Sequence, residues 1–207
     1  MARKASSFAR MGARFKPQPR ILVLCEDSKS SLTYLREAAQ HFRCHISVEI
    51  SHIGNTDPRG IVAEAKRRQS DYEAVYCAFD RDDHASFDEA LAHAAHKPSV
   101  AVVPSYPCYE YWLLLHFRKT RKPYASSGNR SAADQLIHDL RSEDDMGSYA
   151  KGEPGGLFER LLERLPDARV RAAEVLEHAQ RDGSLNPSTR LHELIALFES
   201  LSKPQLL

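Results

Sequence analysis

Short apolar runs alternate with amphipathic segments along the first half of the chain. The runs lie at 21–25, 45–53, 74–79 and 100–103. Their apolar, β-rich character predicts strands that are covered on both faces of a parallel sheet, and the last strand is expected to stop at Pro104. Apolar residues then recur every three or four positions in 32–42, 59–69 and 87–94, which predicts helices. This alternation predicts an α/β fold in which helices flank both faces of a parallel sheet.

The second half of the chain has the pattern of helices. Residues 108–117 are apolar and aromatic, which predicts a mostly buried helix, with a strand as the alternative. Further helices are predicted at 131–142, 154–165, 167–181 and 187–201. Asn186 is expected to be the N-cap of the last helix and Pro187 its first residue. The glycine-rich stretch 143–156 is expected to be a mobile loop.

Charge divides the chain into three regions. The net charge of +1 hides six basic residues and no acid in residues 1–20, which leaves 23 basic and 28 acidic residues in the rest. We therefore expect a basic, flexible arm at 1–19, an α/β core at 20–125 and a helical C-terminal extension at 126–207 that packs on the core. The arm would contact nucleic acid or another acidic partner, or it would be a solvated tail.

Composition excludes several classes of protein. The chain has 207 residues, of which 42% are hydrophobic and 28% charged, as in ordinary soluble globular proteins. It lacks a long apolar run and an apolar leader, so we expect neither a membrane span nor a signal peptide. Its four cysteines match neither a zinc pair nor a disulfide framework, so we expect them to be buried, without a ligand role, in a reducing cytoplasm. They are Cys25, Cys44, Cys77 and Cys108.

Acidic residues follow two of the predicted strands directly. Glu26 comes after the first strand, and Asp80, Asp82 and Asp83 come after the third. The carboxyl ends of parallel strands meet at one edge of a sheet, so these acids should converge there. A divalent cation would keep such carboxylates ionised, and all-oxygen ligation favours Mg²⁺ or Mn²⁺. Asp83 is also a candidate helix cap.

Other charged residues are candidates for the same chemistry. Glu110 lies among aromatic residues and cannot be buried unpaired, so it should reach the metal crevice or pair with a basic group. Lys151 is either a cation for a transition-state phosphate or a solvated lysine. His84 is either a base beside the metal ligands or a surface residue. A basic helix face could bind a nucleic-acid backbone or be merely solvated, and it consists of Arg59, Lys66, Arg67 and Arg68.

Five blocks of sequence follow one another along the chain: Cys25-Glu26, Phe79 to His84, Pro107 to Phe117, Tyr149-Ala150-Lys151 and Asn186 to Thr189. In this order they resemble the RloB-like proteins, a branch of the Toprim superfamily. The resemblance covers roughly residues 20–200. It implies a Toprim-like Rossmannoid core and metal-dependent phosphodiester chemistry, in a protein of prokaryotic defence that works beside an ABC/AAA-type ATPase partner.

The resemblance also implies roles for single residues. Glu26 would be a metal ligand or general acid/base, and Asp80 and Asp82 would be the Asp-x-Asp pair that holds the metal. It raises His116 to a candidate site residue, whereas a core histidine is the ordinary outcome at the end of a leucine run.

Three positions depart from the family pattern. Asp27 replaces a glycine, and either adds a ligand or narrows the approach of the phosphate. Ser30-Ser31 replaces a Thr-Glu pair, so an accessory acid is missing. Ser105-Tyr106-Pro107 stands where Ser-Asn-Pro is common.

The leading hypothesis is an Mg²⁺- or Mn²⁺-dependent Toprim-type endonuclease that cleaves DNA or RNA, including tRNA as a candidate substrate, in antiviral defence. Its catalytic residues would be Glu26, Asp80, Asp82, Glu110, Lys151 and His116. One alternative is a haloacid-dehalogenase-type phosphatase, because Phe79-Asp80-Arg81-Asp82 also resembles its nucleophile strand; Asp80 would then be the nucleophile and Glu26 would be idle. The other is a non-catalytic Toprim-like binding module that regulates an ATPase. An oligomer is compatible with all three.

Overall fold

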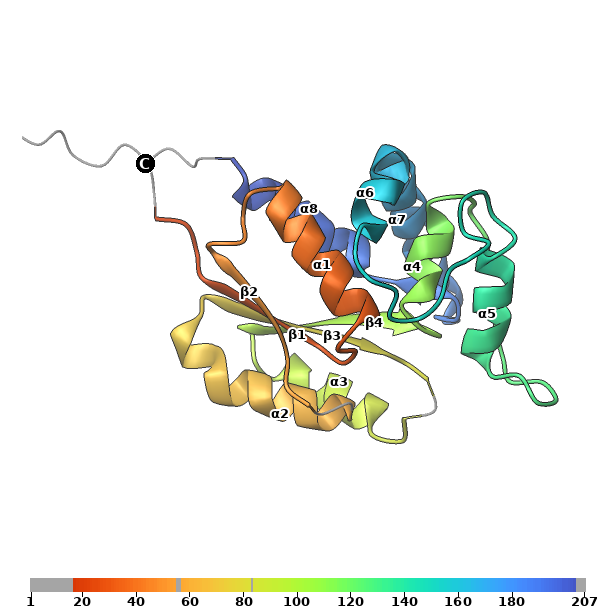
Figure 1. Cartoon of the computed structure of the whole chain (residues 1–207). Coiled ribbons are helices and arrows are strands. Elements are labelled where there is room, and N and C mark those ends of the chain that lie inside the picture. The colour runs from red at the N-terminus through yellow and green to blue at the C-terminus, as the bar shows by residue number, and fades with distance from the viewer. Residues whose placement is uncertain (1–16, 55–56, 83, 204–207) are drawn as a thin grey trace, which may run out of the picture.

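A five-stranded sheet forms the centre of the protein in the computed structural model, which describes residues 17–54, 57–82 and 84–203 (Figure 1). The strand order is β2-β1-β3-β4-β5. The strands are β1 (Ile21–Cys25), β2 (Val48–His52), β3 (Ala74–Asp80), β4 (Val100–Tyr106) and β5 (Ser188–Thr189). Strands β1 to β4 pair in parallel, and β5 pairs antiparallel with β4. The mostly parallel α/β fold agrees with the prediction.

Helices cover both faces of the sheet. They are α1 (Ser30–His41), α2 (Pro58–Arg68), α3 (Phe87–Ala95), α4 (Glu110–Leu115), α5 (Ala132–Leu140), α6 (Leu157–Leu161), α7 (Leu165–Asp182) and α8 (Leu191–Leu201). Short 3₁₀ turns follow α2 at Gln69–Asp71 and α6 at Leu162–Arg164. Helices α2 and α3 form one layer, and the remaining helices lie on the other side (Figure 1).

The alternation of side chains along β1 divides the core in two. Ile21, Val23 and Cys25 belong to the larger cluster, which also contains residues of α1, α4, α7 and α8. Leu22 and Leu24 belong to the smaller cluster, with residues of α2 and α3. All five are buried, as expected for a strand covered on both faces. The sheet is therefore held rigidly from both sides, and its carboxyl edge is a stable platform.

Several predicted boundaries are wrong. The helix predicted at 154–165 is limited to α6 and the 3₁₀ turn after it, and α7 begins already at Leu165. Strand β4 continues through Pro104 to Tyr106. The carbonyl of Pro104 accepts from the Arg190 N–H at 3.2 Å, on the side of β4 that faces away from β3. The N–H and carbonyl of a strand residue point to the same side, so the N–H that proline lacks would not have bonded to β3. The last helix begins at Leu191 rather than at Pro187, because Ser188 and Thr189 form β5 instead.

Asn186 is consequently not a helix cap. Its side-chain amide donates to the carbonyl of Tyr124 at 2.6 Å and accepts from the Tyr124 N–H at 3.3 Å. The segment 143–156 is irregular, as expected, and it is tied to α1, because the Gly152 N–H donates to Ser30 Oγ at 2.9 Å.

The C-terminal part shares the sheet and the larger core cluster with the rest of the chain, through β5 and α8. Residues 1–16 of the expected basic arm lie outside the described residues. Within the described part, no helix combines the length and the apolar character that a membrane span requires.

Candidate active site

The ends of β1 and β3 position the first two carboxylates. The Glu26 N–H donates to the Ala78 carbonyl at 3.0 Å, which continues the ladder between the two strands by one residue. Glu26 Oε2 accepts from the backbone N–H of Asp80 at 2.7 Å. The side chain of Glu26 is therefore fixed by the last residue of the neighbouring strand, as the register of a parallel sheet allows.

His84 contacts the same glutamate. Its Nε2 lies 2.9 Å from Glu26 Oε1, and both side chains are largely shielded from solvent. Burial raises the pKa of Glu26 above its ordinary value, although the hydrogen bond from the Asp80 N–H and the neighbouring His84 act in the opposite direction. Of the two roles open to His84, the structure supports the one beside the acidic cluster.

Glu110, the first residue of α4, brings a third carboxylate to this edge. It is only 1% exposed. Its Oε1 accepts from the Tyr149 hydroxyl at 3.1 Å, and its Oε2 lies 3.7 Å from Lys151 Nζ. Among the described residues, Oε2 has no hydrogen-bond partner. A buried carboxylate oxygen without a hydrogen bond is costly and requires an explanation.

Asp80 stands between the other acids. Burial raises its pKa well above the usual range, and the charges of Glu110, Glu26 and Asp82 raise it further. Oxygen atoms of Asp80 and Glu110 and the sulfur of Cys108 all lie within 4.8 Å of one another. The residues present fit a divalent cation, because such an ion would neutralise the crowded carboxylates and provide a partner for Glu110 Oε2.

Asp82 completes the acidic edge after β3. Its φ angle of +27° is rarely adopted by residues other than glycine, although Asp tolerates it better than most. Its backbone N–H donates to the Pro107 carbonyl at 3.2 Å. With Glu26, Asp80 and Glu110, it lines a cavity of about 410 Å³.

Lys151 lines the same cavity. Burial alone would lower the pKa of this lysine, but the carboxylate of Glu110, with Cys108, Asp80 and Asp82, raises it to about 12. The side chain therefore stays charged at neutral pH, and half of it is exposed. With Lys29, it brings positive charge to a cavity that is otherwise lined by several acids.

The comparisons with known proteins bear on this architecture. The model of the RloB-like protein family matches residues 21–198. The chain belongs to the RloB-like family. No curated protein and no solved structure matches it. The resemblance seen in the five blocks is confirmed, and the match spans every acid described above and Lys151.

His116 of this RloB-like protein lies in the core rather than at the carboxyl edge. It is 2% exposed, its Nδ1 lies 3.0 Å from the Trp112 carbonyl and its Nε2 lies 3.4 Å from the Tyr34 hydroxyl. Burial lowers its pKa to about 4, so the ring is neutral at pH 7. It does not line the cavity, and this position supports a structural role instead of the expected site role.

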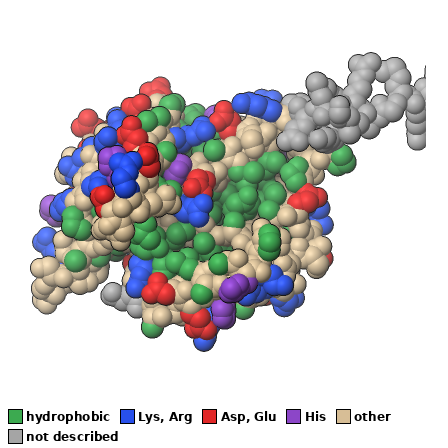
Figure 2. Space-filling view, turned by 180° about the vertical axis from the view of Figure 1, so that it is seen from behind, with side chains coloured by type: hydrophobic (Ala, Val, Ile, Leu, Met, Phe, Trp, Pro, Cys, Tyr) green, Lys and Arg blue, Asp and Glu red, His purple; other side chains and the backbone are tan. Residues whose placement is uncertain are grey.

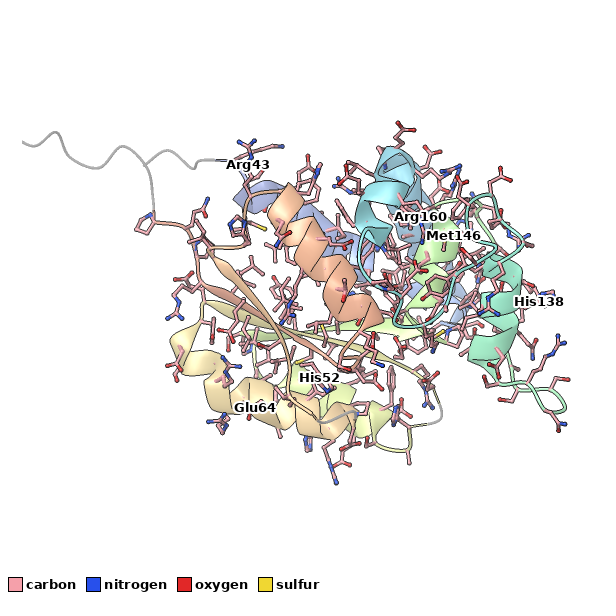
Figure 3. All side chains as sticks on the ribbon, in the orientation of Figure 1. Arg43, His52, Glu64, His138, Met146 and Arg160 are labelled. Carbon is pink, nitrogen blue, oxygen red and sulfur yellow. The ribbon has the colours of Figure 1, made fainter. Side chains whose placement is uncertain are left out.

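The basic face of α2 is not one free patch in the RloB-like fold. Arg67 pairs with Glu64 at 2.5 Å, and Arg68 pairs with Glu49, at the start of β2, at 2.8 Å. Arg59 lies two turns away along the helix, 3.6 Å from Glu89. Lys66 is half-buried. Figure 3 labels Glu64 on α2, in the layer on the other side of the sheet from α4. The acids beside these arginines weaken the case for a phosphate-binding face.

Sequence analysis missed the positions of Cys108 and Asp27. All four cysteines are buried, as predicted, but Cys108 lies among candidate ligand atoms. Its place two residues before Glu110 was the available signal. The carboxylate of Asp27 accepts from the N–H groups of Lys29 at 2.9 Å and Ser31 at 2.8 Å, so it fixes the start of α1 rather than serving only as a ligand or an obstacle. Asp83 lies outside the described residues.

Proposed function

We propose that this RloB-like protein is an Mg²⁺- or Mn²⁺-dependent nuclease of Toprim type that hydrolyses phosphodiester bonds in DNA or RNA. The observation that carries the proposal is the buried Glu110 oxygen without a hydrogen bond, beside Asp80 and at the edge where Glu26 and Asp82 also converge. Such a set of acids is costly without a cation, and it faces an open cavity that also contains a lysine.

The carboxylates divide into two groups by their surroundings. Asp80 and Glu110, with Asp82 at the rim, are the candidate ligands. The chemistry that a bound Mg²⁺ or Mn²⁺ supplies is polarisation of the phosphate and activation of water. Glu26 is already held by the Asp80 N–H and by His84, so we assign it the role of the base that accepts the proton of the attacking water. His84, which lies at Oε1, would stabilise the Glu26 side chain after this proton transfer.

Lys151 serves the phosphate. Its ammonium group is charged and lies at the boundary between the buried Glu110 and solvent. As a phosphoryl oxygen gains negative charge, this ammonium group offsets that charge without rearrangement of the site.

The biological setting is also proposed. The motif resemblance supports a role in antiviral defence in the cytoplasm, with an ABC/AAA-type ATPase as partner and tRNA among the candidate substrates. A free nuclease would damage its host, so activity should depend on the partner or on a restricted substrate.

The test is a cleavage assay on supercoiled plasmid, single-stranded RNA and total tRNA, with Mg²⁺ or Mn²⁺, without and with an ABC/AAA-type ATPase as the proposed partner. Glu26→Gln and Asp80→Asn should abolish cleavage, whereas Glu64→Gln on α2 should not. A phosphatase would instead hydrolyse a phosphate monoester and would survive Glu26→Gln. Wild-type protein that cleaves nothing in the presence of its partner would refute the nuclease and favour the binding module.

A further inference from the structure

A second, larger hollow adjoins the acidic cavity. It has a volume of about 1560 Å³, and Asp82 and Lys151 line both hollows. One wall contains Arg81, His84 and the end of β4, and the other contains α5 and the loop before it. That loop projects from the body of the molecule (Figure 1), and the space-filling view shows its projecting tip (Figure 2). Small-molecule pockets span about 300–1,000 Å³, so this groove suits part of a polymer better.

Positive charge lies on both walls of the groove. Arg81 comes from the first wall, and Arg130 and Arg141 come from the second, with Lys151 where the groove meets the acidic cavity. The side chain of Arg81 donates to the carbonyls of Asp82 and His84, and the side chain of Arg141 donates to the Tyr149 carbonyl. These arginines therefore keep their charge available to an anion, unlike Arg67 and Arg68, which contact carboxylates.

The lining offers little for reading bases. Its tyrosines, Tyr106 and Tyr124, are only 9% and 1% exposed, which leaves the imidazoles of His84 and His138 as the more exposed rings. Binding of single strands by stacking uses several exposed aromatic faces. Cations with so little stacking surface are typical of contact with the phosphodiester backbone, which does not depend on sequence.

We infer that this groove holds the backbone of the nucleic-acid substrate and leads one phosphate to Lys151 and the acidic cavity. The inference rests on the proposed function, because that function makes nucleic acid the ligand. It makes the groove, rather than the basic face of α2, the main binding surface. Arg130 and Arg141 would hold phosphates on the α5 side and Arg81 on the opposite side. The strand would pass Asp82 before it reaches Glu110.

The test measures binding rather than cleavage, with Ca²⁺ in place of Mg²⁺. Fluorescent single-stranded DNA, single-stranded RNA and duplex DNA are titrated at several salt concentrations. Arg130→Glu should weaken the best-bound ligand about tenfold or more and should reduce the slope of log K against log salt by about 1. Lys66→Glu, on α2, changes the net charge by the same amount as Arg130→Glu and should weaken binding much less.

A second pair of variants is matched in local structure. Ser142 lines the groove, Ser200 lies on α8, and each hydroxyl donates to the carbonyl three residues before it. Ser142→Glu should weaken binding, and Ser200→Glu should not. Equal effects within either pair, or no binding by the wild type, would overturn the inference. If binding changes as expected but the protein cleaves nothing with its partner, the proposed function fails and the groove stands.

Discussion

Replacing Glu110 with Gln tests the cation site without any assay of activity. The substitution keeps the size of the side chain and an oxygen that can accept from the Tyr149 hydroxyl. It removes one negative charge from a carboxylate that is 1% exposed and lies within 4.8 Å of a ligand atom of Asp80.

The magnitude follows from that distance. Two unit charges 4.8 Å apart repel by about 3.5 kcal/mol at an effective dielectric constant of about 20. The attraction to Lys151 is lost as well, but this lysine is half exposed, so its contribution is about 0–1 kcal/mol. The raised pKa of Asp80 acts in the same direction, because burial and the neighbouring acids favour its uncharged form. We expect metal-free Glu110→Gln to be more stable than wild type by about 1–3 kcal/mol.

The assay is unfolding by heat and by urea, with EDTA and with Mg²⁺ or Mn²⁺. A cation at about 100 times its Kd should stabilise the wild type by about 2.7 kcal/mol, and most of this gain should disappear in Glu110→Gln. Glu64→Gln, which alters a surface carboxylate on α2, should keep the full gain. If Glu110→Gln retains the wild-type gain, the cation does not bind at this edge and the argument fails.

Three other predictions concern single groups of the site and the core. The folded-state pKa of His116, about 4, lies below its ordinary value of 6.5, so its stabilising contribution is complete above pH 6.5 and is lost as the pH falls toward 4. The free energy of unfolding of the wild type, measured with a chemical denaturant, should therefore fall by about 3 kcal/mol over that range, and that of His116→Gln should not. If this variant lost all cleavage activity, the histidine would be catalytic. The raised pKa of Asp80 means that protons compete with a cation for this carboxylate, so the affinity for Mn²⁺ measured by calorimetry should fall as the pH is lowered, and a pH-independent affinity would contradict this. Lys151→Met should lower the cleavage rate about 10²–10³-fold while cation binding is kept or strengthened, because a positive charge beside Glu110 is removed, and unchanged cleavage would remove the lysine from the mechanism.

The acidic edge could be predicted because it follows from strand order alone. Glu26 and Asp80 each end a run of apolar residues, and parallel strands bring such positions together whatever the loops do. Residues beyond the strands were harder. Asn186 has the type of a helix cap, but its amide binds the Tyr124 backbone, and the residues after it add a strand to the sheet. A contact across 62 positions leaves no local signal.

The groove shows the same limit. The arginines of α2 stand out as a basic cluster in the sequence, yet their acidic partners include Glu49, which is 19 positions from Arg68. The arginines that line the groove are separated along the chain at positions 81, 130 and 141, and only the fold gathers them. Local charge density was therefore a poor guide to the proposed binding surface.

The site is assembled from early and late parts of the chain. Glu26 and Asp80 come from the ends of β1 and β3, whereas Tyr149 and Lys151, the partners of Glu110, come about 40 residues after it. A ribosome that has just released residue 110 has therefore exposed the acids but not the hydroxyl and the ammonium group that contact Glu110. For the proposed nuclease, this order of synthesis delays a complete site until most of its own messenger RNA has been read.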